Sequence, residues 1–192
     1  MRLSTISLII FITLYSPCFA QTTNLPPGHA VEKMGLSIGS LAQFTKYKSS
    51  PVVLLGFETT LKAKDDWVIG AQFKSLRSTR TESTFTSEDS SNKLEAMFTS
   101  VKIGKIIFND EQYNVTIYSN IGFGRVGYKG TTDKKDFLFI EPTIDFEYMF
   151  FSPLKFSTSL SWLFLNNAGI NGLSEKDLSQ LSVGFVGKIA VY

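Results

Sequence analysis

From residue 33 onward the chain alternates between apolar and polar residues with a period of two. In the first such segment Met34, Leu36 and Ile38 alternate with Gly35 and Ser37. This period is typical of β-strands, because successive side chains of a strand point to opposite faces of the sheet. Seven further apolar rows follow, within Val53–Leu61, Trp67–Phe73, Met97–Ile103, Tyr113–Phe123, Leu138–Tyr148, Leu154–Phe164 and Leu181–Val191. The pattern predicts eight strands of roughly 10 to 14 residues, longer than the strands usual in soluble sheets.

The connections between these segments alternate in length and character. Three are short, namely Lys62–Asp66, Asn109–Gln112 and Phe151–Pro153. The others are mostly longer and rich in Ser, Thr, Asn, Gly and charged residues: Tyr47–Pro51, Ser78–Asn92, Lys129–Asp136 and Asn166–Lys176. Short turns at one rim and longer loops at the other are typical of up-and-down outer-membrane barrels, and an even strand number allows antiparallel closure.

Alternation alone does not say which face of the strands is in contact with water. A soluble lipocalin-like barrel that carries a hydrophobic ligand places its apolar rows inside, whereas a membrane barrel places them outside. The polar rows here consist largely of Gly and Ser, which suit the crowded interior of a barrel of eight strands. They also hold charges of both signs that we expect to pair in the lumen: Glu58, Glu141, Asp145 and Glu147 with Lys74, Lys102 and Lys155. These features favour the membrane barrel, and the soluble periplasmic or secreted barrel is the alternative.

The apolar rows contain aromatic residues suited to a membrane interface. The chain has 17 Phe, 7 Tyr and 2 Trp among its 192 residues. Aromatic side chains are common in strands, and they form girdles at both interfaces of membrane barrels. We expect Trp67, Tyr113, Tyr148 and Trp162 to be girdle residues.

The first 20 residues have the features of an export signal. Arg2 is followed by an apolar stretch from Ile6 to Tyr15, and Pro17 precedes small residues suited to cleavage before Gln21. The residues before Cys18, the only cysteine of the chain, fit a lipid-attachment motif poorly. The sequence therefore predicts a cleaved signal peptide over 1–20, a lead-in over 21–32 and a barrel domain over 33–192, which places the protein in the cell outer membrane of a Gram-negative bacterium.

In its strand number, strand length and connections the segment 33–192 resembles the small outer-membrane barrels of the OmpA/OmpX type. The resemblance implies an all-β fold: an eight-stranded antiparallel up-and-down transmembrane β-barrel with short periplasmic turns and longer extracellular loops. The chain departs from that pattern in two places. The last apolar row is one residue out of phase with the terminal aromatic Tyr192, and Pro142 lies within the sixth strand, where it suggests a bulge or a strand end.

The sequence indicates no catalytic centre. The only histidine, His29, lies in the lead-in, so a histidine-assisted serine mechanism is unexpected. The formal net charge of +2 is too small to indicate nucleic-acid binding. No motif for a metal, a nucleotide or another cofactor is present. Glu141, Asp145 and Glu147 form a carboxylate row that suggests either a lumen salt-bridge network, which we favour, or a cation site or proton path.

We therefore expect a non-enzymatic monomer with a structural or surface-interaction role. Its expected partners are outer-membrane lipids, lipopolysaccharide and the barrel-insertion machinery. The loop from Ser78 to Asn92 contains Arg80, Glu82, Phe85, Glu88 and Asp89. It is either an ordinary solvated loop or a contact site for a surface ligand, since loops often carry function.

Overall fold

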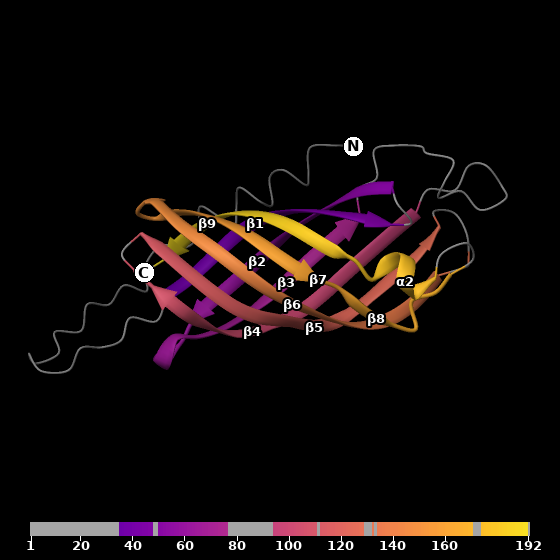
Figure 1. Ribbon diagram of the computed structural model, residues 1–192, viewed down its shortest axis with the longest axis horizontal. Coiled ribbons are helices and arrows are strands. Elements are labelled where there is room, and N and C mark those ends of the chain that lie inside the picture. Colours follow the sequence, from indigo (N-terminus) through magenta and orange to yellow (C-terminus); the bar gives the residue numbers. More distant parts are fainter. Residues whose placement is uncertain are drawn as a thin grey trace, which may run out of the picture. The chain divides into compact units, whose positions relative to one another are not determined.

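The computed structural model describes residues 35–47, 50–76, 94–110, 112–128, 132, 134–170 and 174–191. These residues form one compact unit, an antiparallel β-barrel (Figure 1). The strands are β1 (Gly35–Tyr47), β2 (Ser50–Lys62), β3 (Trp67–Leu76), β4 (Leu94–Asn109), β5 (Tyr113–Tyr128), β6 (Lys134–Phe151), β7 (Leu154–Trp162), β8 (Phe164–Asn166) and β9 (Leu181–Val191). Two short helices accompany them, the 3-10 helix η1 (Lys64–Asp66) and α2 (Glu175–Leu178).

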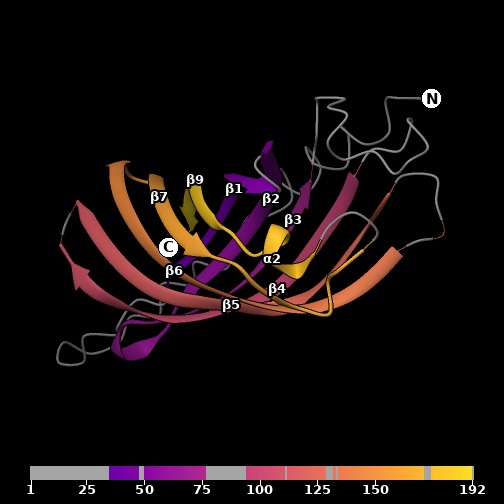
Figure 2. The same ribbon diagram turned by 45° about the vertical axis from the view of Figure 1, so that its right-hand side comes forward.

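The sheet closes on itself. The strands follow one another in the order β5-β4-β3-β2-β1-β9-β7-β6, and β6 pairs with β5 to complete the ring. β1 pairs with β9, which joins the first and last strands antiparallel. The view in Figure 2 shows the strands curving around the barrel axis. The predicted architecture of an eight-stranded up-and-down barrel is confirmed.

The elements β7 and β8 form one barrel strand. Thr143 of β6 pairs with Ser161 of β7, and continuing that register by three residues leads to the observed pair of Ile140 with Phe164 of β8. The interruption between them lies opposite Pro142, which has no N–H to donate to the ladder. Nine strand elements therefore make eight barrel strands.

The expectation of a bulge or strand end at Pro142 is wrong. β6 runs without interruption across this residue, and Pro142 pairs in register with Ser119 of β5. The missing donor interrupts the neighbouring strand instead. The register shifts lie at the turn end of the barrel, between Ile106 and Phe108 of β4 and between Met149 and Phe151 of β6.

The strands differ in length more than the sequence pattern predicts. β4 and β5 have 16 residues each and β6 has 18, whereas β3 has 10. The pattern underestimates the long strands because their outer ends lose the simple apolar and polar alternation. The first connection is also tighter than expected, since Tyr47 pairs with Ser50.

We call the rim formed by η1 and the connections 110–112 and 152–153 the turn end, and the opposite rim, where α2 lies, the loop end (Figure 1). At the turn end Asp65 and Asp66 have positive φ angles of 58° and 62°, a conformation that Asp adopts more readily than most residues. No helix in the described part of the chain is long and apolar enough to span a bilayer.

Candidate functional site

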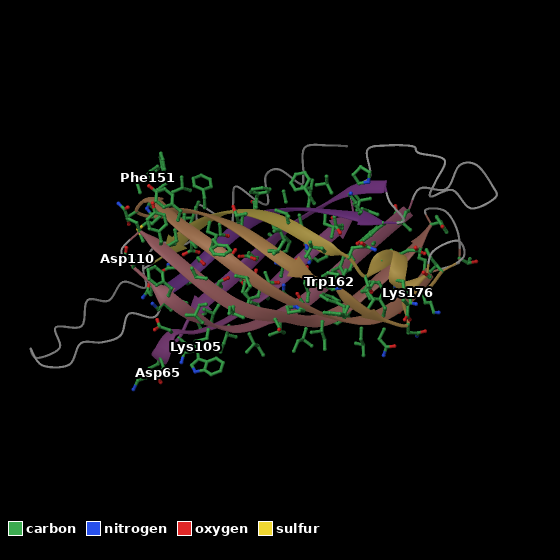
Figure 3. All side chains as sticks on the ribbon, in the orientation of Figure 1. Asp65, Lys105, Asp110, Phe151, Trp162 and Lys176 are labelled. Carbon is green, nitrogen blue, oxygen red and sulfur yellow. The ribbon has the colours of Figure 1, made fainter. Side chains whose placement is uncertain are left out.

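The outer face of the barrel is apolar. Many side chains project outward along the length of the barrel (Figure 3). Every barrel strand contributes exposed apolar side chains, for example Phe57 of β2, Ile117 of β5 and Phe185 of β9. An exposed apolar surface of this extent is unusual for a soluble monomer and marks contact with lipid or with other protein. The orientation that the sequence favoured is confirmed, and the lipocalin-like alternative, which needs these rows inside, does not fit.

The four expected girdle residues all face outward. Trp67, Tyr113 and Tyr148 lie toward the turn end, and the rings of Tyr113 and Tyr148 are 5.0 Å apart between centroids. Trp162 lies toward the loop end and stacks on Phe164 with centroids 6.2 Å apart. All four side chains thus lie on the outer face, where a girdle residue has to lie, and their place at an interface stays a prediction.

The lumen contains a buried charge network, and Glu141 is the centre of its first cluster. The carboxylate accepts from Lys74 Nζ at 2.6 Å, from Gln43 Nε2 at 2.7 Å, from Ser161 Oγ at 3.0 Å and from Asn120 Nδ2 at 3.1 Å. Lys74 Nζ also donates to Gln43 Oε1 at 2.8 Å. A carboxylate with four donors from four other strands is well compensated for its loss of water.

Lys102 and Lys188 form a second cluster around Glu58. Lys102 Nζ donates to Glu58 Oε2 at 2.7 Å and lies 4.3 Å from the ring centroid of Tyr118. Gln72 Nε2 donates to the same carboxylate oxygen at 3.1 Å. Lys188 Nζ lies 3.4 Å from Glu58 Oε1. The ammonium of Lys102 is therefore held between a carboxylate and an aromatic face, both of which favour its charged form.

Lys188 links this cluster to the turn end of the lumen. Its Nζ donates to Asp145 Oδ2 at 3.0 Å and to Glu147 Oε2 at 3.1 Å. Glu147 accepts in addition from Lys155 Nζ at 2.9 Å and from Asn114 Nδ2 at 3.2 Å. The carboxylate row of Glu141, Asp145 and Glu147 is thus divided among three lysines, and each carboxylate has a cation beside it.

Four lysines face four carboxylates in this network, so its formal charge is balanced. The pairings expected for Lys74, Lys102 and Lys155 are confirmed. Sequence reasoning missed Lys188, although its place in the alternation of β9, four residues after Gly184, puts it on the inner row. It also missed the amides of Gln43 and Asn120 as ligands of Glu141, because a residue on an inner row does not reveal which strand it faces across the barrel.

The loop end of the lumen is apolar instead. Inward side chains from six strands, from residues 163–170 and from α2 form one cluster there: Tyr47, Val52, Leu54, Leu76, Leu94, Ala96, Phe98, Val126, Tyr128, Phe137, Phe139, Leu163, Ala168, Ile170 and Leu178. Phe98 lies 5.5 Å from both Phe137 and Phe139 between ring centroids. We call this cluster the apolar compartment. The alternation does not predict this compartment, because its side chains are apolar although they lie on the rows that the alternation marks as polar.

Several sequence candidates lie outside the described residues, namely His29, Cys18, Tyr192 and the loop Ser78–Asn92. Among the residues that the structure does describe, no group of three or more His, Cys, Asp or Glu side chains is placed to hold a metal ion. What the lumen shows is a packed and charge-balanced interior.

No family model and no curated protein matches the sequence. The fold, however, matches solved structures. Neisserial surface protein A aligns with a TM-score of 0.59 at 5% identity, over 82% of this chain and 96% of that one. The N-terminal β-barrel domain of Pseudomonas aeruginosa OprF aligns with a TM-score of 0.55 at 10% identity, over 83% of this chain and all of that one. Ail, the attachment invasion locus protein of Yersinia pestis, aligns with a TM-score of 0.51 at 12% identity, over 82% of this chain and 97% of that one.

These three proteins are small eight-stranded outer-membrane barrels. The aligned region spans nearly the whole of each of them, while the identity is too low to carry over any residue's role. The chain has the fold of the small eight-stranded outer-membrane β-barrels.

Proposed function

We propose that the protein is a non-enzymatic integral barrel of the cell outer membrane, exported through a cleaved signal peptide, with its turn end in the periplasm and its loop end at the cell surface. The observation that carries the proposal is the combination of an apolar outer face with a charge-paired lumen. In water this arrangement would leave large apolar side chains hydrated on every strand, whereas in a bilayer it buries them.

The role that fits this architecture is structural or consists of contact at the surface. The described inward side chains are largely buried, and barrels of eight strands are usually filled by their own side chains, so a wide diffusion channel is not part of the proposal. The partners we propose are outer-membrane lipids and lipopolysaccharide around the wall, the insertion machinery during assembly, and a surface ligand at the loop 78–92. The barrel acts as a monomer in this proposal.

Cell fractionation tests the location. The protein should be found in the detergent-extracted outer membrane, and its band on SDS gels should migrate differently with and without boiling, because a folded barrel resists SDS. Recovery in the soluble periplasmic fraction without such a shift would contradict the proposal.

Cysteine labelling tests the orientation with two matched lysines. Lys176 is exposed on α2 at the loop end, and Lys64 is exposed in η1 at the turn end (Figure 3 labels Lys176 and the neighbouring Asp65). A membrane-impermeant maleimide applied to intact cells should label the Lys176→Cys variant and not the Lys64→Cys variant, and lysed cells should label both. The reverse pattern on intact cells would invert the proposed orientation.

A further inference from the structure

A β-bulge at the turn end of β4 adds an apolar residue to the outer face. Ile106 pairs with Thr116 of β5 and Phe108 pairs with Val115, so Ile107 is an extra residue between the two pairs. By alternation Ile107 belongs to the outer row, and Phe108 joins that row because its partner Val115 lies on the outer row of β5. Successive residues of a regular strand point to opposite faces, whereas here both side chains are more than half exposed.

A second bulge has the same effect in β6. Met149 pairs with Lys155 of β7 and Phe151 pairs with Leu154, which makes Phe150 the extra residue. Phe150 and Phe151 are both more than half exposed, and their ring centroids are 5.4 Å apart. Two separate bulges therefore bring pairs of consecutive apolar residues to the outside of the same end of the barrel. We call this set the apolar rim: Ile107, Phe108, Phe150 and Phe151.

The apolar rim continues the apolar outer face toward the tips of the strands. Phe150 lies 6.4 Å from Phe156 of β7 between ring centroids. Phe156 pairs with Tyr148, one of the expected girdle residues. Phe151 comes after Tyr148 and is the last residue of β6, next to the connection 152–153. The apolar surface therefore reaches past the expected girdle to the end of this hairpin.

The opposite side of the turn end is charged. In the ring of strands the hairpin of β2 and β3 lies across from the hairpin of β6 and β7, with β4 and β5 between them on one side and β1 and β9 on the other. Its turn is η1, where Lys64 and Asp65 are exposed and Lys62 Nζ lies 3.0 Å from Asp66 Oδ1. Figure 3 labels Asp65 and Phe151 at this end of the barrel, on opposite sides of the view. One hairpin thus ends in charged side chains and the other in aromatic rings.

Lys105 lies at the border between the two sides. It is exposed on the outer row of β4 and pairs with Trp67 of β3. A lysine can lay its methylene groups along an apolar surface while its ammonium reaches water or phosphate. A cation at this border is therefore compatible with lipid on the side of the apolar rim and with water on the side of η1.

We propose that the apolar rim binds the interfacial layer of a lipid leaflet, so that the bilayer surface crosses the barrel at an angle, with the apolar rim immersed and η1 in water. This inference rests on the proposed membrane location. Lipid is the occupant that fits, because the apolar rim is continuous with outward rows that face lipid in that location. Three of its four residues are phenylalanines, and aromatic side chains gather at membrane interfaces. Immersion of η1 to the same depth would remove water from charged side chains, which is costly.

Fluorescence quenching in vesicles tests the proposal. Chains that carry Cys18→Ser and one new cysteine, at Phe108→Cys, Phe151→Cys or Asp65→Cys, are labelled with the fluorophore NBD. They are folded into phosphatidylcholine vesicles that contain a phospholipid with a nitroxide either near the glycerol end or at the far end of an acyl chain. We expect the nitroxide near the glycerol end to quench the labels at 108 and 151 several-fold more than the label at 65. Ile117→Cys, on the outer row of β5, should be quenched by the nitroxide at the chain end and reports the membrane location itself.

A pair of double variants tests whether the apolar rim sets the angle. Phe150→Ser/Phe151→Ser removes the rings of β6 and should lower the quenching of the label at Phe108→Cys, because that side of the barrel is then immersed less deeply. Lys64→Ser/Asp65→Ser keeps η1 polar and should leave that quenching unchanged. The shift of the unboiled band on SDS gels shows that each variant is folded. Equal quenching at 108 in both double variants would overturn the angle.

The remaining outcomes separate this inference from the membrane location. If Ile117→Cys is quenched while Phe151→Cys and Asp65→Cys are quenched equally, the protein lies in lipid but the one-sided apolar rim is wrong. The same holds if neither of those two labels is quenched, which would leave the apolar rim as a contact for another protein. If Ile117→Cys is not quenched, the membrane location fails, and this inference fails with it.

Discussion

The two halves of the lumen fill the same barrel with opposite chemistry. Toward the turn end, inward positions hold lysines and carboxylates that pair across strands, as Glu58 does with Lys102. Toward the loop end, inward positions hold packed apolar side chains such as Phe98 and Phe139. The first half depends on the pairing of buried charges, and the second depends on the packing of apolar side chains. A single substitution should therefore lower the free energy of unfolding for a different reason in each half.

One of the two largest effects should come from leaving a buried charge without its partner. Glu141→Leu removes the carboxylate that Lys74 contacts at 2.6 Å, with both side chains 2% exposed or less. Breaking a buried pair in this way typically costs about 3–5 kcal/mol. The double variant Lys74→Met/Glu141→Leu removes both charges and should recover most of that loss. Urea unfolding in detergent measures the free energies, and a double variant as unstable as the single one would show that pairing is not what stabilises this half.

In the apolar compartment the expected loss comes from a cavity. Phe98→Ala should lower the free energy of unfolding by about 3–5 kcal/mol, because Phe98 is 2% exposed and packs against two other rings. The matched control is Phe123→Ala on the outer face, where the side chain is 64% exposed and lipid or detergent fills the space. Equal losses for the two variants would contradict the assignment of Phe98 to a packed interior.

In the proposed membrane location the wall separates this interior from lipid, so a charge on the outer face should be costly as well. Ile117→Arg places a cation among outward side chains of β5 and should cost about 2–4 kcal/mol near the bilayer midplane. The control Ile117→Leu keeps the surface apolar. Unfolding in lipid vesicles measures the difference, and a cost below 1 kcal/mol would indicate that this row does not contact hydrocarbon.

The smallest effect is expected for an ion pair on the outer surface. Arg125 donates to both carboxylate oxygens of Asp136, at 2.6 and 3.0 Å, but both side chains are more than half exposed. Exposed pairs of this kind contribute little, since water screens the attraction. Arg125→Ala should therefore leave the unfolding midpoint unchanged within error. A loss comparable to that of Glu141→Leu would mean that burial does not distinguish the two ion pairs.

The alternation of apolar and polar residues was enough to predict much of the fold. It placed Leu36 and Ile38 on one face and Glu58 and Lys102 on the other, and the structure confirms both faces. The two faces could be predicted because the side-chain period of a strand is two, so a shift by one residue would exchange them. The number of strands and the antiparallel closure followed from counting the alternating segments. The prediction of a bulge or strand end at Pro142 was wrong. A proline lacks the N–H that a neighbouring strand would accept from, so the break can lie in the neighbouring strand instead of its own.

What only the tertiary structure decided is which inward residues meet across the lumen. Neighbours in sequence say nothing about the contact between Gln43 and Glu141, since it depends on the register and tilt of strands far apart in the chain. The division of the lumen into a charged and an apolar half has the same origin, because inward residues from different strands reach the same level only after closure. Leu178 is a further case: in the sequence it is one apolar residue of a connection, and only the closed barrel places it among the buried residues of the apolar compartment.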